Sequence, residues 1–259
     1  MKPLPSIILF SLSLVLSVSN LFAQSDQIVD LMEQAKTLRD KYEDTKALAV
    51  FEKILQLDGN NMEALYNAGY LYSRLGWMAE DVDKEKAKGY YTKSKYFADR
   101  TYKLYPASFE ANLLMAGAIA RLAQYGTTKE RVTTAWDIKK YADVAAKLKP
   151  EDPILKHMLA WWNYELSKPT WFERSMADML FGGIPKGADI NKAIKMMKEL
   201  ITLRPDYIVY RYDIALMYEY LGDQKSALAW VQSALKISPK APEEYNYIVA
   251  GKKLQERLM

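Results

Sequence analysis

Cysteine is absent from this chain of 259 residues. The protein therefore forms no disulfide bond and carries no lipid-modified cysteine. Histidine is nearly absent as well, since His157 is the single one, and a lone histidine is more often structural than a ligand. A zinc site would have to use carboxylates alone, a ligand set that zinc sites rarely use. The sequence accordingly predicts neither a metal nor a cofactor.

A strong excess of charge of one sign is also missing. The formal net charge is +4, and acidic and basic residues are mixed along the chain, so nucleic acid is a poor candidate partner. The sequence contains no nucleophile with its base, no acid-base pair and no phosphate-binding glycine loop that would indicate catalysis. It therefore predicts a protein that is not an enzyme.

Long hydrophobic runs are limited to the beginning of the chain. The apolar run from Ile7 to Val18 covers about a dozen residues, the length of a signal-peptide core and too short for a membrane span. We expect residues 1–23 to be a signal peptide, cleaved after Ala23 or near Ser17 and Ser19, with an uncleaved anchor as the alternative. This interpretation predicts an exported protein, periplasmic or extracellular, without a membrane span after cleavage.

Regularly placed helix-ending residues are the main positive feature. Pro106, Pro150, Pro205 and Pro239 each close an amphipathic segment, and Gly59 holds the same place once more. The preceding residues follow the small and large positions of the tetratricopeptide repeat (TPR), in which small residues let two antiparallel helices approach closely. In the last unit these positions are Ile214, Ala215, Tyr218, Leu221, Gly222, Ala227, Val231 and Ala234, and in the first unit Ala35, Leu38, Ala47, Phe51 and Ile54.

The repeats predict an all-α, TPR-type right-handed α-solenoid of about five helix pairs in residues 24–259. In the central units, around residues 76–86 and 125–128, either the turns are lengthened or the helices are extended. The fourth unit is stretched most, and residues 169–181 predict an extra helix inside it. We place the repeats at about 28–61, 62–108, 109–152, 153–207 and 208–241, and a C-terminal capping helix at 242–259.

The irregular segments resemble one TPR family. Leu159-Ala160-Trp161-Trp162-Asn163-Tyr164-Glu165 is followed by Trp171-Phe172-Glu173-Arg174-Ser175-Met176-Ala177 and then by Leu180-Phe181-Gly182-Gly183, an insert that ordinary TPR repeats lack. With these motifs, the chain between Leu122 and Pro239 resembles the regulator of microtubule dynamics family. The resemblance implies the TPR fold. Because microtubule association belongs to intracellular relatives, the expected export makes this chain a relative that shares the fold and not that partner.

The first helix of each TPR unit lines the concave side of the solenoid, which predicts where a partner binds. The aromatic and basic side chains expected there suit a peptide segment or an amphiphilic small molecule. The same aromatic residues also serve to pack neighbouring repeats, which is the commoner role. The predicted groove residues are Lys36, Arg39, Tyr66, Tyr70, Arg74, Leu113, Arg121, His157, Trp161, Tyr164, Tyr212 and Glu219.

The leading functional hypothesis is a non-catalytic protein-interaction scaffold of the cell envelope that binds a partner protein or peptide in this groove. The alternative is a small-molecule carrier, or a transporter-associated component, with a pocket lined by Tyr70, Trp161 and Tyr212. The insert at residues 169–188 either covers the groove or points away from it. The sequence leaves the oligomeric state open.

Overall fold

The computed structural model describes residues 24–168, 171–183, 185 and 187–259. The predicted signal peptide, residues 1–23, lies outside the described residues. All regular elements of the described part are helices, so the all-α prediction is confirmed. In this part of the chain, no helix combines the length and the apolar character needed to cross a membrane.

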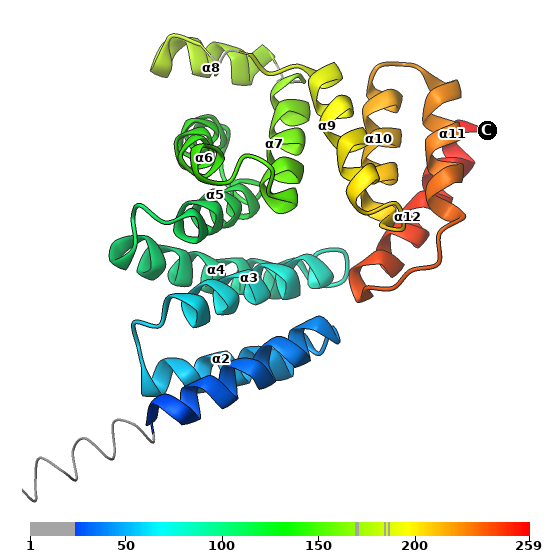
Figure 1. Cartoon of the computed structure of the whole chain (residues 1–259). Coiled ribbons are helices and arrows are strands. Elements are labelled where there is room, and N and C mark those ends of the chain that lie inside the picture. Colours follow the sequence, from blue (N-terminus) through cyan, green and yellow to red (C-terminus); the bar gives the residue numbers. More distant parts are fainter. Residues whose placement is uncertain (1–23, 169–170, 184, 186) are drawn as a thin grey trace, which may run out of the picture.

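Antiparallel helix pairs stack side by side into a curved array (Figure 1). Neighbouring helices in the sequence are mostly neighbours in space, as expected for a solenoid. After a helix over residues 24–40, the elements are α2 (Asp44–Leu57), α3 (Met62–Ala79), α4 (Lys84–Leu104), α5 (Phe109–Ala123), α6 (Thr128–Leu148), α7 (Pro153–Leu166), α8 (Trp171–Phe181), α9 (Ile190–Leu203), α10 (Ile208–Tyr220), α11 (Gln224–Leu235) and α12 (Pro242–Leu258).

Side-chain caps fix where most of these helices begin. At each such start, a short polar side chain accepts a hydrogen bond from a backbone N–H of the first turn, and replacing such a cap by alanine costs about 1 kcal/mol. At Thr127 the cap is reciprocal, because Glu130 also accepts from the Thr127 backbone N–H. The capping residues are Asn61, Asp83, Ser108, Thr127, Asp152, Asp189 and Asp223.

The central units differ from plain TPR units because their helices are extended. Helix α3 continues through Gly76, where the repeat pattern usually turns, and α4 begins after a short link at Lys84. Gly76 is buried against the ring of Tyr91, so close that a Cβ on Gly76 would lie 2.6 Å from Tyr91 Cε1. The absence of a side chain at Gly76 thus lets α4 lie against the last turns of α3, and both helices lengthen together.

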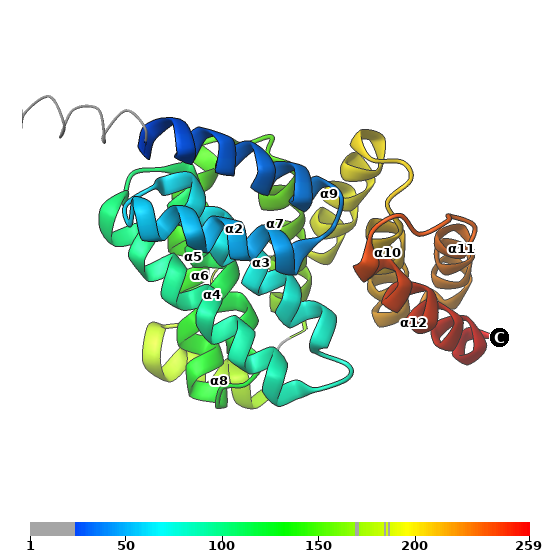
Figure 2. The ribbon, with the colours of Figure 1, turned by 90° about the horizontal axis from the view of Figure 1, so that it is seen from below.

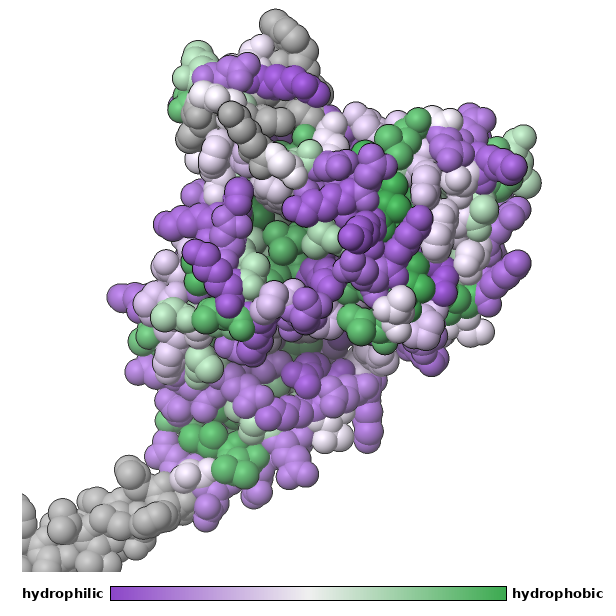
Figure 3. Space-filling view, turned by 45° about the horizontal axis from the view of Figure 1, so that its top comes forward, coloured by the Kyte–Doolittle hydropathy of each residue, from purple (hydrophilic) through white to green (hydrophobic). Residues whose placement is uncertain are grey.

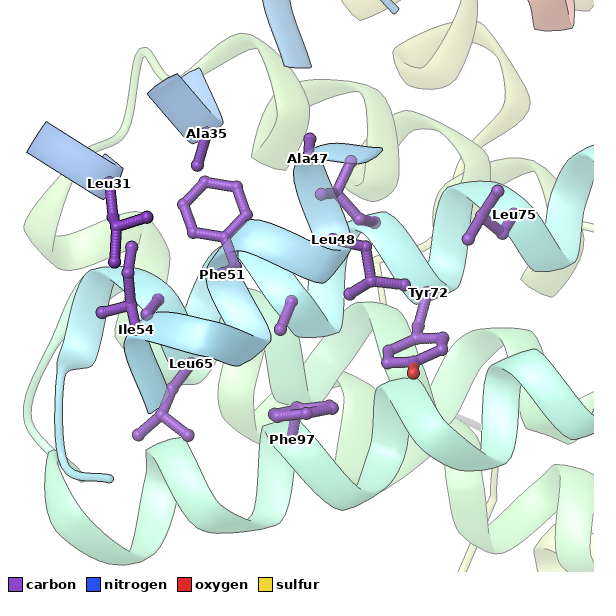
Figure 4. Close-up of a cluster of buried hydrophobic side chains, with 13 residues drawn as sticks. Leu31, Ala35, Ala47, Leu48, Phe51, Ile54, Leu65, Tyr72, Leu75 and Phe97 are labelled. Atoms are coloured by element: carbon purple, nitrogen blue, oxygen red, sulfur yellow. The ribbon is translucent and has the colours of Figure 1, made fainter. Parts of the chain in front are cut away.

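The core consists of layers between successive helices, with alanine where helices cross. Figure 4 shows the first layer, in which the Phe51 ring of α2 points toward Ala35 of the preceding helix. Ala35, Ala47 and Phe51 are completely buried. Because alanine occupies little space, the two helices approach closely while large side chains such as Ile54 fill the remaining volume.

The predicted extra helix in the fourth unit exists as α8. It packs along α6, and Figures 1 and 2 both show it away from α10 and α12. Ala177 is buried, whereas Met179 is largely exposed. Helix α8 therefore lies on the flank of the array beside α6 and does not cover the side where α12 runs.

The last helix reaches back to the second unit of the array. Helix α12 packs on α10 and α11 and also contacts α3. In Figure 1 the beginning of α12 lies next to the end of α3. The sequence predicted a helix here that caps the stack, and it did not predict this second contact. The solenoid is consequently curled until its last helix touches α3 of the second unit.

Candidate interaction surface on the inner face

Helices α3, α5, α7 and α10 are the first helices of the second to fifth units, and we call the side of them that was predicted to line the groove the inner face. Most of the predicted groove residues belong to these four helices, and Lys36 and Arg39 belong to the helix over residues 24–40. Near the closure by α12, the structure brings residues from different helices together. Tyr70, Arg74, Arg121 and Tyr212 all lie there.

A buried ion cluster joins α2, α3 and α12. Arg74 Nη2 donates to Glu243 Oε2 over 3.1 Å, and Arg74 Nε lies 3.1 Å from Asp44 Oδ2, without the alignment of a hydrogen bond. All three side chains are more than nine-tenths buried. Since two carboxylates share one guanidinium, the cluster carries an excess negative charge when both are ionised. Ionising Asp44 in the folded protein is therefore costly.

The cost of ionising Asp44 appears as a raised pKa of its carboxyl group. Burial raises it from 3.8 to about 6, Arg74 opposes the rise, and the charge of Glu243 adds to it. The face of the Tyr42 ring stabilises the same guanidinium, whose carbon lies 5.2 Å from the ring centroid.

An aromatic contact lies beside the ion cluster. Tyr247 of α12 meets the Trp77 ring of α3 edge-on at 5.3 Å between centroids and the Tyr212 ring of α10 edge-on at 5.1 Å. Arg121 of α5 lies over Trp77 at 5.3 Å. Burial, with Asp213 nearby, raises the pKa of Tyr247 well above its usual value. The ring of Tyr247 is thus enclosed by residues of several repeats.

We use the name closure contact for Asp44, Arg74, Trp77, Tyr212, Glu243 and Tyr247 together. The sequence prediction missed Asp44, Glu243 and Tyr247, because it took only first helices as groove-lining and treated α12 as a cap. It missed Trp77 because it left residues 76–86 open between a lengthened turn and an extended helix. The sequence did contain a feature that could have indicated the role of α12. Glu243 and Tyr247 are four residues apart and so share one face of a helix.

Glu244, next to Glu243, anchors the beginning of α12. Its Oε1 accepts from the backbone N–H of Ile208 over 3.1 Å, and its Oε2 accepts from those of Lys240 over 2.6 Å and Ala241 over 2.9 Å. These bonds satisfy donors at the starts of both α10 and α12. The first turn of α12 is therefore held in one place relative to α10.

His157 is paired with a buried acid. Its Nε2 lies 2.8 Å from Asp213 Oδ2, and Asp213 is only 3% exposed. The ring also meets Tyr210 edge-on at 5.3 Å. Burial raises the pKa of Asp213, while the hydrogen bond with His157 opposes the rise. This pair ties α7 to α10, which is a structural use of the single histidine.

At the start of the array, the predicted groove residues interact locally. Lys36 forms an exposed ion pair with Glu63 over 2.7 Å. Arg39 Nη1 donates to Asn67 Oδ1 over 2.8 Å. The rings of Tyr66 and Tyr70 stack at 6.3 Å between centroids.

The remaining predicted residues lie apart from the closure contact. Leu113 is 4% exposed and belongs to the core, so it is not accessible to a partner. Trp161 packs against Tyr164 at 5.1 Å between ring centroids, and the Tyr164 hydroxyl donates to the Leu216 carbonyl over 3.4 Å. Glu219 accepts from Arg257 of α12 over 2.8 and 3.0 Å.

The face of the molecule seen in Figure 3 is mainly hydrophilic, with separate apolar patches. One apolar patch lies near the start of the described chain, where a shallow depression of about 600 Å³ is lined by Ile28, Val29, Met32, Glu33, Lys36, Asn61, Met62 and Glu63. A second depression lies at the start of α6. Among the described residues, no group of His or acidic side chains is arranged to hold a metal ion.

Stacked antiparallel helices with alanine-lined crossings define the class: this is an all-α protein of the TPR type, a fold that commonly serves to bind other proteins. The chain belongs to the family described as regulator of microtubule dynamics protein 1-3, whose model matches residues 31–258. The resemblance seen in the insert motifs is thereby confirmed.

Individual relatives agree with the family. The chain is 24% identical to regulator of microtubule dynamics protein 3 of Bos taurus over 223 residues, covering 85% of this chain and 46% of that protein. It is 26% identical to protein 3 of Rattus norvegicus over 211 residues, covering 80% and 44%. The chain thus spans less than half the length of these two relatives.

Among solved structures, a thermophilic TPR protein of Thermus thermophilus superposes with a TM-score of 0.61. The two are 17% identical, and the match covers 87% of this chain and 99% of that one. At this identity the likeness shows the shared fold alone.

The predicted exported location, periplasmic or extracellular, is wrong. The matched relatives are animal proteins named for regulating microtubule dynamics, and microtubules are intracellular filaments, which points away from export. The prediction depended on the apolar run from Ile7 to Val18. A run of that length is not specific to signal peptides, because interfacial and buried segments contain similar ones.

Proposed function

We propose that this chain is a non-catalytic protein-interaction scaffold and that residues 24–259 act as one TPR unit whose inner face binds a segment of a partner protein. The observation that carries the proposal is the gathering, next to the closure contact, of aromatic and cationic side chains from separate repeats. Tyr70, Arg121 and Tyr212 are half-buried and provide large rigid contact areas and a guanidinium donor, whereas Arg74 is buried and held by Asp44 and Glu243. Such side chains recognise peptide carboxylates and apolar side chains.

The non-catalytic part of the proposal follows from how the titratable groups of the inner face are used. His157 is paired with Asp213, and Arg74 with Asp44 and Glu243. A general acid or base must reach a substrate proton, and a nucleophile must be activated by a free base. These groups instead hold helices together, which supports a binding role.

Site-specific cross-linking in cells tests the inner face directly. The full chain would carry a photoreactive benzoylphenylalanine at Trp161 of α7, which is half-buried on the inner face. The matched control would carry it at Tyr96 of α4, a second helix of its pair, where the side chain is 56% exposed. We expect a partner protein to be cross-linked from position 161 and not from position 96. Cross-links from position 96 only would indicate that the partner binds the outer surface and not the inner face.

The names of the relatives support a partner in the microtubule system. Co-sedimentation of the full chain with polymerised tubulin tests this partner, with Arg121→Gln and Tyr96→Ala as inner and outer variants. We expect binding that is reduced by Arg121→Gln, which removes a half-buried cation, and kept by Tyr96→Ala. Sedimentation at the level of a protein-free control would exclude polymerised tubulin as the direct partner and leave the cross-linking result to identify another.

A further inference from the structure

Helix α12 has two halves with different environments. The second half packs on α10 and α11, where Leu254 is 1% exposed and Gly251 is so close to α11 that an added Cβ would lie 3.0 Å from Leu235 Cδ2. The first half extends beyond this pair and places Glu243 and Tyr247 against α3. The second half of α12 is thus anchored on α10 and α11 without the contact to α3, whereas Glu244 and Tyr247 also tie the first half to α10.

The first half of α12 lies on the inner face as a bound helix would. Glu243 and Tyr247 are four residues apart and project from one side of α12, whereas Arg74 and Trp77 are three residues apart and project from one side of α3. The carboxylate meets the guanidinium at 3.1 Å, and the phenol ring meets the indole at 5.3 Å. Tyr212 of α10 completes the enclosure of the ring.

Arg74, Trp77 and Tyr212 together form the site that receives the first half of α12, and we call this site the seat. The positive charge of the seat is already balanced without Glu243. Asp44 already provides Arg74 with one carboxylate, so a buried pair of zero net charge remains when Glu243 is absent. Glu243 therefore adds a surplus negative charge to a buried position. A buried surplus charge weakens the contact that brings it, so the bond between Glu243 and Arg74 is the weak part of the attachment of α12, whereas the Glu244 bonds to the starts of α10 and α12 are its firm part.

We propose that the seat formed by Arg74, Trp77 and Tyr212 is the recognition site of the inner face, and that the first half of α12 fills it as an internal ligand. The partner that replaces it is a helical segment with an acidic residue followed, four positions later, by an aromatic residue. This inference rests on the proposed function, because it assumes that the inner face binds a partner segment. Displacement of α12 by the partner then couples binding to opening of the curl.

The test uses a fluorescent synthetic peptide with the sequence of residues 240–250 and the full chain. The double variant Glu243→Gln/Tyr247→Ala removes the carboxylate and the ring that α12 places in the seat and so weakens its hold there, and Tyr245→Ala, on the exposed side of α12, is the matched control. By fluorescence anisotropy, we expect the double variant to bind the peptide at least about tenfold more tightly than wild type or the control. Equal binding to all three proteins, or binding to none, overturns the proposal.

Variants of the peptide test the same contacts without changing the protein, so that differences in protein folding do not affect the comparison. A peptide with Glu243→Gln or with Tyr247→Ala should bind the double variant about tenfold more weakly, and equal binding of all peptides would contradict the proposed chemistry. If the double variant fails to show the helical circular dichroism of wild type, Tyr247→Ala alone takes its place.

The cross-linking experiment separates the two proposals. A partner cross-linked at position 161 with the same yield in wild type and Glu243→Gln/Tyr247→Ala overturns the internal-ligand proposal and leaves the proposed function standing. Absence of any cross-linked partner at position 161 contradicts the proposed function, whatever the peptide does.

Discussion

Arg74 of α3 and Glu243 of α12 are 169 positions apart in the chain and hydrogen-bonded over 3.1 Å in the interior of the folded protein. In a repeat array each unit normally contacts only its neighbours, so stability is a sum of nearest-neighbour interfaces. This ion pair links the first half of the array directly to its last helix. Unfolding of the two ends should therefore be more cooperative than in an open solenoid.

Removing the shared cation should be strongly destabilising. Arg74→Met leaves Asp44 and Glu243 buried without a counter-charge, and breaking a buried pair by removing one partner costs about 3–5 kcal/mol. Arg257→Met is the matched control, because its pair with Glu219 is exposed on the Arg257 side and such pairs contribute about 1 kcal/mol or less. Urea unfolding followed by circular dichroism measures both. Similar losses for the two variants would contradict a buried role for Arg74.

The raised pKa of Asp44 predicts how stability depends on pH. Between 3.8 and about 6 the folded state binds more protons at Asp44 than the unfolded state does. The contribution of Asp44 to the free energy of unfolding therefore falls as pH rises through this window, by up to about 3 kcal/mol. Asp44→Asn stays neutral and keeps the Arg74 and Glu243 pair. It should be more stable than wild type at pH 7, and nearly equal to wild type at pH 4.

The measurement is urea unfolding of wild type and Asp44→Asn at pH 4, 5, 6 and 7. Asp206→Asn serves as a control, because Asp206 is exposed and its pKa is lowered by its hydrogen bond with Lys240. A stability difference between Asp44→Asn and wild type that stays constant over this range would show that Asp44 does not titrate there.

Two glycines in first helices should respond oppositely to alanine. A Cβ at Gly76 would lie 2.6 Å from the Tyr91 ring, which is itself completely buried and cannot move away easily. Gly76→Ala should cost about 1–3 kcal/mol through overpacking. At Gly117 nothing lies within 4 Å of the added Cβ, so Gly117→Ala should stabilise α5 by up to about 1 kcal/mol through helix propensity.

Thermal unfolding of both glycine variants gives the comparison. A higher midpoint for Gly117→Ala and a lower midpoint for Gly76→Ala are expected. If Gly76→Ala matched wild type, the close packing of α4 on the end of α3 would not be required for the extended helices.

Local signals in the sequence predicted most of the fold. The four prolines and Gly59 gave ends of second helices close to those observed, and the capping helix predicted at 242–259 is observed as α12, Pro242–Leu258. The lengthening of α3 was left open, because Gly76 looks like a turn residue until Tyr91 is seen to lie against it. These signals act over one or two turns, where periodicity is informative.

The closure contact could not be predicted in the same way. Its position depends on the small rotation between successive units, which accumulates along the array, and no single motif encodes that sum. The predicted groove residues were chosen from first helices only, so Asp44 on α2 and Tyr247 on α12 were omitted. Leu113 was assigned to the groove by the same offsets, and it lies in the core.

The last prediction concerns the pair of His157 and Asp213. His157→Leu removes the hydrogen-bonding partner of a carboxyl group that is 3% exposed, and leaving such a group unsatisfied costs about 1–3 kcal/mol. The double variant His157→Leu/Asp213→Leu removes both polar groups and should recover part of that loss. A double-mutant cycle by urea unfolding gives the coupling energy. Coupling near zero would mean that α7 and α10 are held together by the surrounding apolar contacts, and that the 2.8 Å bond contributes nothing to their alignment.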